Sequence, residues 1–291
     1  MNMKIKGCGT ALVTPFDGGS VDYKSLCVLL DRQLSAGIDF LVPLGSTGET
    51  PCIENDEKLQ ILECCRQQMK LRGVEIPLVV GAGTNSFAAT LRNIQLLSPY
   101  ADALLIVVPY YNKPNQEGQY RYFRSLSENS EKPIILYNVP GRTGVNMEAE
   151  TCLRIAYDCP NVIGIKEASS RREQILKIID SAPEGFSVFS GNDDETLDLM
   201  RCGADGVISV ASNIAPRMMA QMTANVENHT GEELNERLKP LYANCFVESN
   251  PIPVKAGLAA MGLIRNELRL PLVPATEETF KLMEETVKGL E

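Results

Sequence analysis

Short apolar segments rich in β-branched residues alternate with longer segments of helical periodicity eight times along this chain. Each gap between two apolar segments carries a helical pattern, as in residues 22–36, where leucines recur on one face. Strands that alternate with helices predict parallel βαβ units, and eight such units within about 220 residues predict a closed α/β (β/α)8 TIM barrel rather than an open sheet. The predicted strands are residues 9–13, 40–44, 78–80, 103–108, 134–137, 162–166, 186–189 and 206–210.

The pattern changes after the eighth predicted strand. Residues 215–228 complete the helices of the barrel, and three further helical segments follow without strands between them, with prolines at the joins. These segments are residues 231–246, 253–263 and 276–290. We therefore predict a (β/α)8 barrel catalytic domain over residues 1–228 and a C-terminal three-helix domain, a helical appendix, over residues 229–291.

Composition excludes several classes of protein. The chain has 291 residues, of which 44% are hydrophobic, enough for the core of one large barrel. Its net charge is −9 and no block of like charge stands out, so we expect no nucleic-acid and no membrane partner. The longest strongly apolar run, residues 103–108, is too short to cross a bilayer, and residues 1–6 lack the apolar stretch of a signal peptide. We expect a cytoplasmic protein.

Cysteine and histidine usage narrows the chemistry. The nine cysteines include no Cys-x-x-Cys pair, which is typical of reduced, mostly buried thiols. The single histidine, His229, lies in a polar segment far from any predicted strand end. This excludes multi-histidine zinc sites and disfavours a histidine relay. If the chain is an enzyme, we expect no metal, and lysine, tyrosine, hydroxyl or carboxylate groups must transfer its protons.

Lys166 ends the sixth predicted strand, directly after the apolar residues 162–165. A lysine at the mouth of a buried strand loses hydration, which favours the neutral amine. A neutral amine can attack a ketone and form a Schiff base, whereas an ammonium group cannot. The alternative is a strand-end lysine whose stem packs while its ammonium group stays in water.

The other strand ends decide between these alternatives, because barrel enzymes place their chemistry at the C-terminal ends of strands. The second strand is followed by residues 45–49, Gly-Ser-Thr-Gly-Glu, a turn with two hydroxyls and several backbone N–H groups. Such a turn can hold a small carboxylate. An ordinary strand-to-helix turn with a hydroxyl cap remains the alternative.

Tyrosines and an arginine follow the fourth and fifth predicted strands. Tyr110 and Tyr111 come after the fourth, a position where paired tyrosines more often serve packing or an interface. Tyr137 ends the fifth and can exchange a proton, and Arg142 follows it and can bind a carboxylate. The acidic residues 193–195 would repel a phosphate, so we expect an unphosphorylated substrate. Together these groups suit Schiff-base carbon–carbon bond formation or cleavage on a keto acid.

These motifs, in this order, resemble the 4-hydroxy-tetrahydrodipicolinate synthase (dihydrodipicolinate synthase) family within the pyruvate-dependent class I aldolases. The residue 45–49 turn and Lys166 are shared with that wider superfamily, whereas the double tyrosine with Asn112, and Arg142, are more specific to the synthases. The matching segments, residues 45–49, 109–114, 137–144, 164–168, 206–210 and 250–255, run along nearly the whole chain.

The resemblance implies a lyase that condenses pyruvate with L-aspartate-4-semialdehyde to 4-hydroxy-tetrahydrodipicolinate, the committed step of the diaminopimelate and lysine pathway, without a cofactor. It implies that Lys166 forms the Schiff base with pyruvate and that Tyr137 shuttles protons. Thr47 would link Tyr137 to Tyr111 in a hydroxyl relay.

The resemblance also implies which residues bind the substrates. Ser46 and Thr47 would hold the pyruvate carboxylate, and Gly191 and Ile208 would line the pyruvate pocket. Arg142 would bind the carboxylate of the semialdehyde. In the family, the tyrosine at position 111 reaches in from a neighbouring subunit, which implies a homo-oligomer, usually a tetramer built as a dimer of dimers.

The chain departs from the family at positions that bind the end product L-lysine. Asn55 and Lys58 stand where lysine-sensitive members often carry histidines, and Ala89 stands where they carry a glutamate, although Asn85 and Tyr110 match. Loss of an acid and gain of a cation disfavour a cationic effector. We predict weak or absent inhibition by L-lysine.

Two other interpretations remain open. Another pyruvate lyase, such as N-acetylneuraminate lyase or a 2-keto-3-deoxy sugar-acid aldolase, would share the Schiff base but bind sugar hydroxyls in place of the role given to Arg142. A non-catalytic small-molecule-binding barrel is disfavoured, because Lys166, Tyr137, Thr47 and Tyr111 are all present.

Overall fold

Each of the eight apolar segments predicted as a strand overlaps one in the computed structural model, which describes residues 4–290. The described residues group into two units. The first comprises residues 4–6 and 77–208, and the second comprises residues 7–76 and 209–290.

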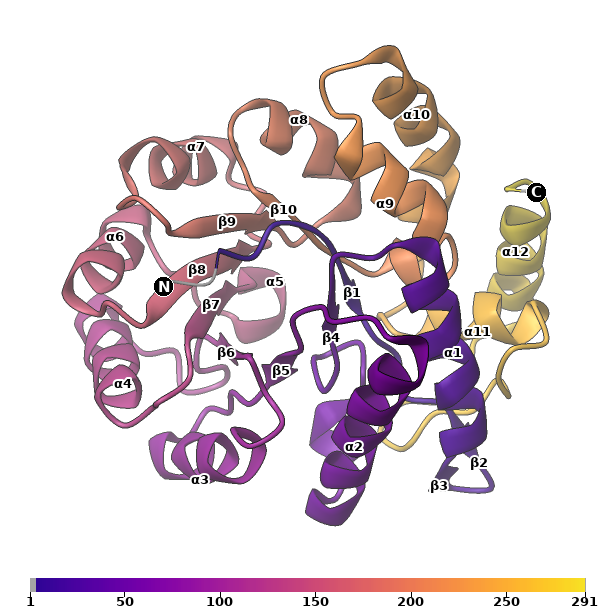
Figure 1. Ribbon diagram of the computed structural model, residues 1–291, viewed down its shortest axis with the longest axis horizontal. Coiled ribbons are helices and arrows are strands. Elements are labelled where there is room, and N and C mark those ends of the chain that lie inside the picture. The colour runs from indigo at the N-terminus through magenta and orange to yellow at the C-terminus, as the bar shows by residue number, and fades with distance from the viewer. Residues whose placement is uncertain (1–3, 291) are drawn as a thin grey trace. The chain divides into compact units, whose positions relative to one another are not determined.

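The first unit is built on six parallel strands whose order is β10-β9-β8-β7-β6-β5. Helices follow the strands in the chain and, apart from the short α5, lie on their outer side (Figure 1). The strands are β5 (Val79–Gly81), β6 (Ala103–Val107), β7 (Ile134–Asn138), β8 (Val162–Glu167), β9 (Ser187–Ser190) and β10 (Gly206–Ser209). The helices are α3 (Phe87–Leu97), α4 (Gln116–Glu128), the short α5 (Pro140–Thr143), α6 (Ala149–Asp158), α7 (Arg172–Ser181), the 3-10 turn η2 (Asp193–Glu195) and α8 (Thr196–Arg201).

The second unit pairs β1 (Gly7–Ala11) in parallel with β4 (Phe40–Val42) and adds a hairpin of β2 (Phe16–Asp17) and β3 (Ser20–Val21), which the sequence pattern missed. The C-terminal segment over the described residues 229–290 contains three helices, as predicted. The predicted domain boundary after residue 228 stays a prediction. The remaining elements are α1 (Tyr23–Ala36), η1 (Thr50–Cys52), α2 (Asn55–Arg72), η3 (Ala211–Asn213), α9 (Pro216–Ala224), α10 (His229–Asn244), α11 (Ile252–Ala260) and α12 (Glu277–Lys288).

Polar caps fix where the helices begin and end. The Asn115 side chain accepts a hydrogen bond from the Gly118 amide at the start of α4, at 2.9 Å, and Asp22 does the same for Ser25 in α1, at 3.0 Å. These side chains satisfy amides that have no partner within the helix. Gly37 ends α1 in the left-handed conformation, with φ 80°, which glycine adopts without steric cost.

The strands of the first unit are buried along their whole length, except at the half-buried Val107 that ends β6. Every residue of β7 and β8 is buried, as expected for parallel strands covered on both faces. The two charged residues at the end of β8, Lys166 and Glu167, are therefore exceptions that need a chemical or structural reason.

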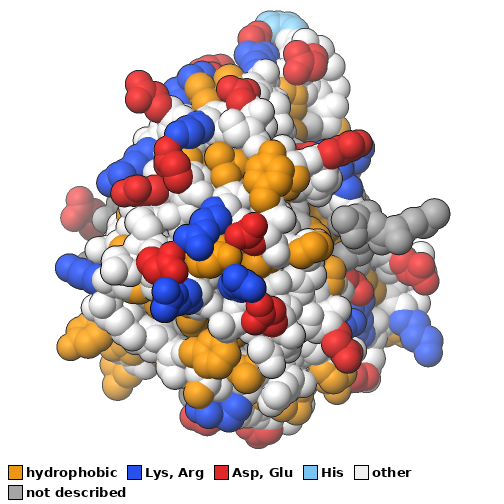
Figure 2. Space-filling view, turned by 90° about the vertical axis from the view of Figure 1, so that its left-hand side faces the viewer, with side chains coloured by type: hydrophobic (Ala, Val, Ile, Leu, Met, Phe, Trp, Pro, Cys, Tyr) orange, Lys and Arg blue, Asp and Glu red, His pale blue; other side chains and the backbone are white. Residues whose placement is uncertain are grey.

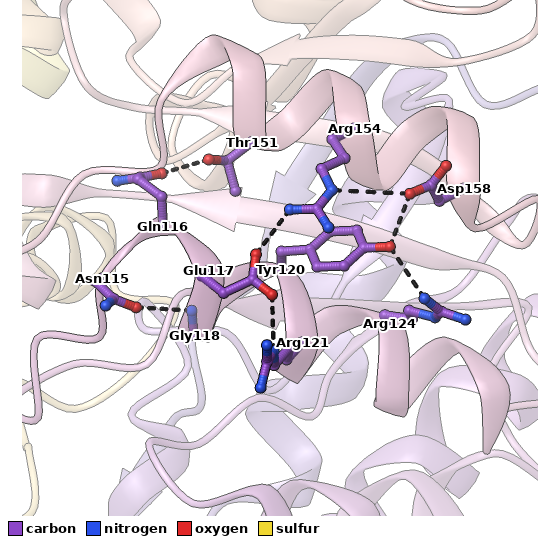
Figure 3. A network of polar contacts seen from close by, with 10 residues as sticks. All are labelled: Asn115, Gln116, Glu117, Gly118, Tyr120, Arg121, Arg124, Thr151, Arg154 and Asp158. Atoms are coloured by element: carbon purple, nitrogen blue, oxygen red, sulfur yellow. Dashed lines mark hydrogen bonds and ion pairs between the residues drawn. The ribbon is translucent and has the colours of Figure 1, made fainter.

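On the outside of the first unit, a polar network joins α4 to α6 (Figure 3). Arg154 of α6 donates a hydrogen bond to Glu117 of α4 at 2.8 Å. Its guanidinium carbon also lies 3.4 Å from the centre of the Tyr120 ring, and the Tyr120 hydroxyl donates to Asp158 at 2.7 Å.

The face shown in Figure 2 mixes acidic, basic and apolar side chains. Exposed ion pairs of this kind contribute little each, so the helices depend mainly on their apolar packing. No helix among residues 4–290 is long and apolar enough to cross a membrane.

Gly164 offers a direct test of how tightly β8 packs. A Cβ placed on Gly164 would lie 2.5 Å from the backbone oxygen of Ser187 on β9, whereas a Cβ on Gly141 would meet nothing within 4 Å. We expect Gly164→Ala to lower the free energy of unfolding by about 1–3 kcal/mol, because the strands must separate to admit the methyl group. Urea denaturation measures this, with Gly141→Ala as the matched control. Equal stability of the two variants would contradict the packing described.

Candidate active site

Lys166 and Tyr137 are neighbours across two paired strands. The register of β7 and β8 aligns Tyr137 with Lys166, and both side chains are buried, with exposed fractions of 7% and 6%. The Lys166 Nζ lies 4.5 Å from the centre of the Tyr137 ring. Within residues 4–290, Lys166 has no ion-pair partner. A buried amine without a counter-charge beside a phenol fits a nucleophile with an adjacent proton donor.

The residues that follow this pair lock the register from the opposite face of the strands. Asn138 is aligned with Glu167, and its amide nitrogen lies 3.1 Å from each of the Glu167 carboxylate oxygens. The same carboxylate accepts hydrogen bonds from the Ser169 amide at 2.9 Å and from Gln174 at 3.0 Å. Burial raises the pKa of Glu167, and these hydrogen bonds oppose the rise. The network is a structural lock on the two strand ends, since side chains alternate between faces.

Gly191 and Ile208 lie on the same face as Lys166. The strands align Lys166 with Phe189 of β9, which is aligned with Gly206 of β10. Gly191 and Ile208 each follow two residues later and therefore share that face. Gly191 also has a packing role, because a Cβ there would lie 2.5 Å from the Ala168 Cβ. Both residues predicted to line the pyruvate pocket thus lie just beyond the level of Lys166, Gly191 after the end of β9 and Ile208 on β10.

Arg142 and Tyr111 lie on loops that are tied together. Arg142 is exposed in α5, the short helix that follows β7. The Tyr111 amide donates a hydrogen bond to the carbonyl of Thr143, the residue after Arg142, at 3.4 Å. Tyr111 has a left-handed backbone, with φ 68°, and its side chain is 88% exposed. Its neighbour Asn112 donates to the carbonyl of Asn85 at 3.0 Å. The loop is thus held in a conformation that costs about 1–3 kcal/mol and that presents a phenol to solvent.

In the second unit, the turn of residues 45–49 follows β4 and presents free donors. The amides of Ser46 and Thr47 have no acceptor within residues 4–290, whereas those of Gly48 and Glu49 close the turn onto the carbonyls of Gly45 and Ser46, each at 3.1 Å. Two adjacent unused N–H groups in a tight turn form a small anion-binding concavity. The turn that the sequence suggested for a carboxylate therefore has the geometry to bind one.

Thr47 is held by a residue for which no role was predicted. Asn250, just before α11, donates its amide N–H to the Thr47 hydroxyl oxygen at 2.9 Å, and both side chains are buried. Because a hydroxyl carries one proton, accepting this bond leaves the Thr47 O–H available to donate elsewhere. Asn250 thus restricts the directions in which the Thr47 O–H can point.

Lys255, the other lysine near a motif, is engaged in a buried ion pair. Its side chain is 0% exposed, and its Nζ donates to Glu49 at 2.6 Å and to the Thr14 carbonyl at 2.9 Å. The amine also lies 4.2 Å from the centre of the Phe16 ring. Burial lowers the pKa of Lys255, and Glu49 counteracts this. An amine with these partners is a structural cation rather than a nucleophile.

Lys166 and Tyr137 could be predicted from their strand ends, whereas Asn250, Glu49, Glu167 and Lys255 were not given roles. All four lie inside the matched motifs, but Asn250 bonds a residue 203 positions away along the chain, and Lys255 and Glu49 are 206 positions apart. Among residues 4–290, no three acidic, histidine or cysteine side chains come together in a way that could hold a metal ion.

Comparison with solved structures defines the class of protein. The crystal structure of dihydrodipicolinate synthase from Thermotoga maritima matches with a TM-score of 0.95 and 45% identity, covering 99% of this chain and 100% of that one. The chain therefore has the (β/α)8 barrel fold with C-terminal helices. The structure of the Acinetobacter baumannii dihydrodipicolinate synthase complexed with pyruvate matches with a TM-score of 0.94 and 38% identity, covering 98% and 99% of the two chains.

The sequence comparisons identify the family. The model of the dihydrodipicolinate synthetase family matches residues 4–290. The 4-hydroxy-tetrahydrodipicolinate synthase of Thermotoga neapolitana is 47% identical over 287 residues, which are 96% of each protein. The chain belongs to the dihydrodipicolinate synthetase family, as its motifs indicated.

The ion pair between Lys255 and Glu49 yields a test of which lysine is structural. We expect Lys255→Met to lower the free energy of unfolding by about 3–5 kcal/mol, because it leaves a buried carboxylate without its cation. Glu49→Gln added to Lys255→Met removes that charge and should recover part of the loss. Urea denaturation measures both variants. A single variant as stable as the parent protein would contradict the structural role.

Proposed function

We propose that this chain is a lyase that condenses pyruvate with L-aspartate-4-semialdehyde to 4-hydroxy-tetrahydrodipicolinate, in the pathway to diaminopimelate and lysine. Membership of the family and the names of its relatives support this activity. The observation that carries it is the buried Lys166 amine aligned with Tyr137 at the ends of two adjacent strands. We propose a cytoplasmic location, in keeping with the sequence.

Lys166 attacks C2 of pyruvate through its neutral amine, and the ketone oxygen leaves as water to give an imine. Loss of a proton from C3 converts the imine into an enamine, which attacks the aldehyde carbon of the semialdehyde. The amino group of the second substrate then closes the ring at C2 and releases Lys166. Tyr137 supplies and accepts protons in these steps, because its ring lies beside the amine.

The turn of residues 45–49 anchors the pyruvate carboxylate through the Ser46 and Thr47 amides, which lack other acceptors within residues 4–290. A carboxylate held in this way orients the ketone carbon toward the Lys166 amine, so the turn positions the substrate and takes no part in bond formation. Gly191 and Ile208 line the pocket for the methyl side of pyruvate. Thr47 passes protons between Tyr137 and Tyr111, and Asn250 orients its hydroxyl.

Arg142 binds the carboxylate of the semialdehyde, since its guanidinium group can hold a carboxylate with two parallel hydrogen bonds. The exposed Tyr111 beside it supports a homo-oligomer, which we propose to be a tetramer built as a dimer of dimers. A phenol held outward by a strained backbone gains a function when a second subunit receives it.

Borohydride trapping tests the covalent step. We expect reduction in the presence of pyruvate to leave one lactyl-sized adduct on Lys166, since borohydride reduces an imine to a stable amine. Peptide mass spectrometry locates the adduct, and Lys166→Ala should gain none. An adduct on Lys255, or none on the parent protein, would overturn the assignment.

The choice of aldehyde separates this function from that of other pyruvate lyases. Aspartate semialdehyde should be turned over with pyruvate, whereas sugar aldehydes should not, because Arg142 recognises a carboxylate. Turnover of sugar aldehydes alone would favour an N-acetylneuraminate lyase or a sugar-acid aldolase.

Asn250→Asp tests the direction of the proton relay with little change in shape. A carboxylate accepts the Thr47 proton instead of donating to its oxygen, so we expect kcat to fall on the order of 10²-fold at neutral pH. Burial raises the pKa of such a carboxyl, and its protonated form can donate again. The ratio of variant to parent activity should therefore rise as the pH falls, which a pH–rate profile measures.

Thr47→Val is the matched control for that experiment. Without the hydroxyl there is no relay to reverse, so adding Asn250→Asp to Thr47→Val should cost much less activity than it does in the parent protein. A loss that is the same at every pH, and the same with or without Thr47, would show that Asn250 acts only in packing.

The response to L-lysine tests the departures at positions 55, 58 and 89. We expect millimolar L-lysine to leave the rate nearly unchanged, because Lys58 adds a cation and Ala89 removes an acid. The rate of condensation at rising L-lysine measures this, with L-arginine as a control for charge alone. Half-inhibition below about 1 mM would contradict the prediction.

A further inference from the structure

Two cysteine thiols that the proposed reaction does not use lie in contact between α1 and α2 of the second unit. The sulfur atoms of Cys27 and Cys64 are 3.0 Å apart, and both side chains are half-buried. A disulfide bond is about 2.05 Å long, so closure by about 1 Å would join them. Half-burial leaves the pair accessible to a small oxidant.

The surroundings of the two thiols give them different roles. Burial raises the pKa of Cys64 to about 12, and its hydrogen bond with Cys27 acts in the same direction. Burial thus disfavours the Cys64 thiolate, and in the contact between the two sulfurs either one can be the donor. The thiolate is the nucleophilic form of cysteine, so the attacking sulfur is that of Cys27 and the resolving thiol is that of Cys64.

The other seven cysteines are placed differently. Cys65 is next in the chain to Cys64 but fully buried, and burial raises its pKa. Cys52 and Cys202 are half-buried, but Cys52 donates to the Leu270 carbonyl at 3.3 Å and Cys202 accepts from Arg172 at 3.4 Å. The remaining buried thiols are Cys8, Cys152, Cys159 and Cys245. Oxidation should therefore select the pair between the helices.

We propose that Cys27 and Cys64 form a reversible dithiol site that is oxidised to a disulfide by hydroperoxides. The Cys27 thiolate attacks one peroxide oxygen, the O–O bond breaks, and hydroxide leaves as Cys27 becomes a sulfenic acid. The Cys64 thiol then attacks the Cys27 sulfur, the S–O bond breaks, and water leaves. Two thiols and one hydrogen peroxide thus give one disulfide and two waters, and a small dithiol reverses the change.

The bond would tie α1 to α2 across 37 residues of sequence. A cross-link of this length restricts the unfolded chain, so the oxidised protein should unfold at a higher temperature. Neither helix carries a residue assigned to substrate binding or proton transfer. Oxidation should therefore leave the rate of pyruvate condensation unchanged.

The experiment titrates the reduced full-length protein with hydrogen peroxide after removal of the reductant. We expect the thiols that react under denaturing conditions to fall from nine to seven (nine minus two), with an intact mass lower by two hydrogens. A non-reducing peptide map should join the segments of Cys27 and Cys64, dithiothreitol should restore nine thiols, and the unfolding temperature should rise on oxidation.

Serine variants test which of the two cysteines attacks the peroxide and which one resolves the sulfenic acid. Cys64→Ser should accumulate oxygen adducts on Cys27 without a cross-link, Cys27→Ser should lose the reaction, and Cys202→Ser should behave as the parent protein does. The proposal is overturned if the parent protein keeps all nine thiols, if Cys52 or Cys202 is oxidised first, or if Cys27 reaches the sulfinic acid without a bond to Cys64.

Discussion

The alignment of β7 with β8 is the constraint on which the proposed chemistry depends. It sets Tyr137 beside Lys166 on one face and Asn138 beside Glu167 on the other. A slip of one residue would turn Lys166 outward and bring Glu167 to its place, because successive side chains of a strand point to opposite faces. The hydrogen bonds of the buried Glu167 carboxylate with its three partners, Asn138, Ser169 and Gln174, oppose that slip.

In the second unit, a buried ion pair holds the turn of residues 45–49 in its conformation. Two residues with left-handed backbones mark the ends of this turn: Leu44, at φ 59°, precedes it, and Glu49, at φ 55°, is its last residue. Such conformations persist only when the surroundings impose them. Lys255 and the Arg269 amide both donate to the Glu49 carboxylate, at 2.6 and 3.1 Å, and thereby hold the end of the turn. Lys255 is thus structural because it has a carboxylate partner, whereas Lys166 has none among residues 4–290 and is suited to the proposed chemistry.

Much of this arrangement could be predicted from the sequence. The strand runs and helix periods are local signals, and Lys166, Tyr137, Arg142 and the glycine-rich turn all stand at strand ends, where barrel chemistry lies. What could not be predicted depends on partners far away along the chain. Lys255 bonds a residue 206 positions earlier, and Asn250 bonds one 203 positions earlier. The two-residue strands of the β2–β3 hairpin are too short to give a periodic pattern.

The proposed chemistry of this protein depends on a covalent bond between Lys166 and pyruvate. A crystal structure of the protein soaked in pyruvate measures it directly. We predict continuous electron density from the Lys166 Nζ to C2 of pyruvate, with the Tyr137 hydroxyl within hydrogen-bonding distance of the adduct. Pyruvate held without a bond to Lys166, or joined to another lysine, would contradict the account.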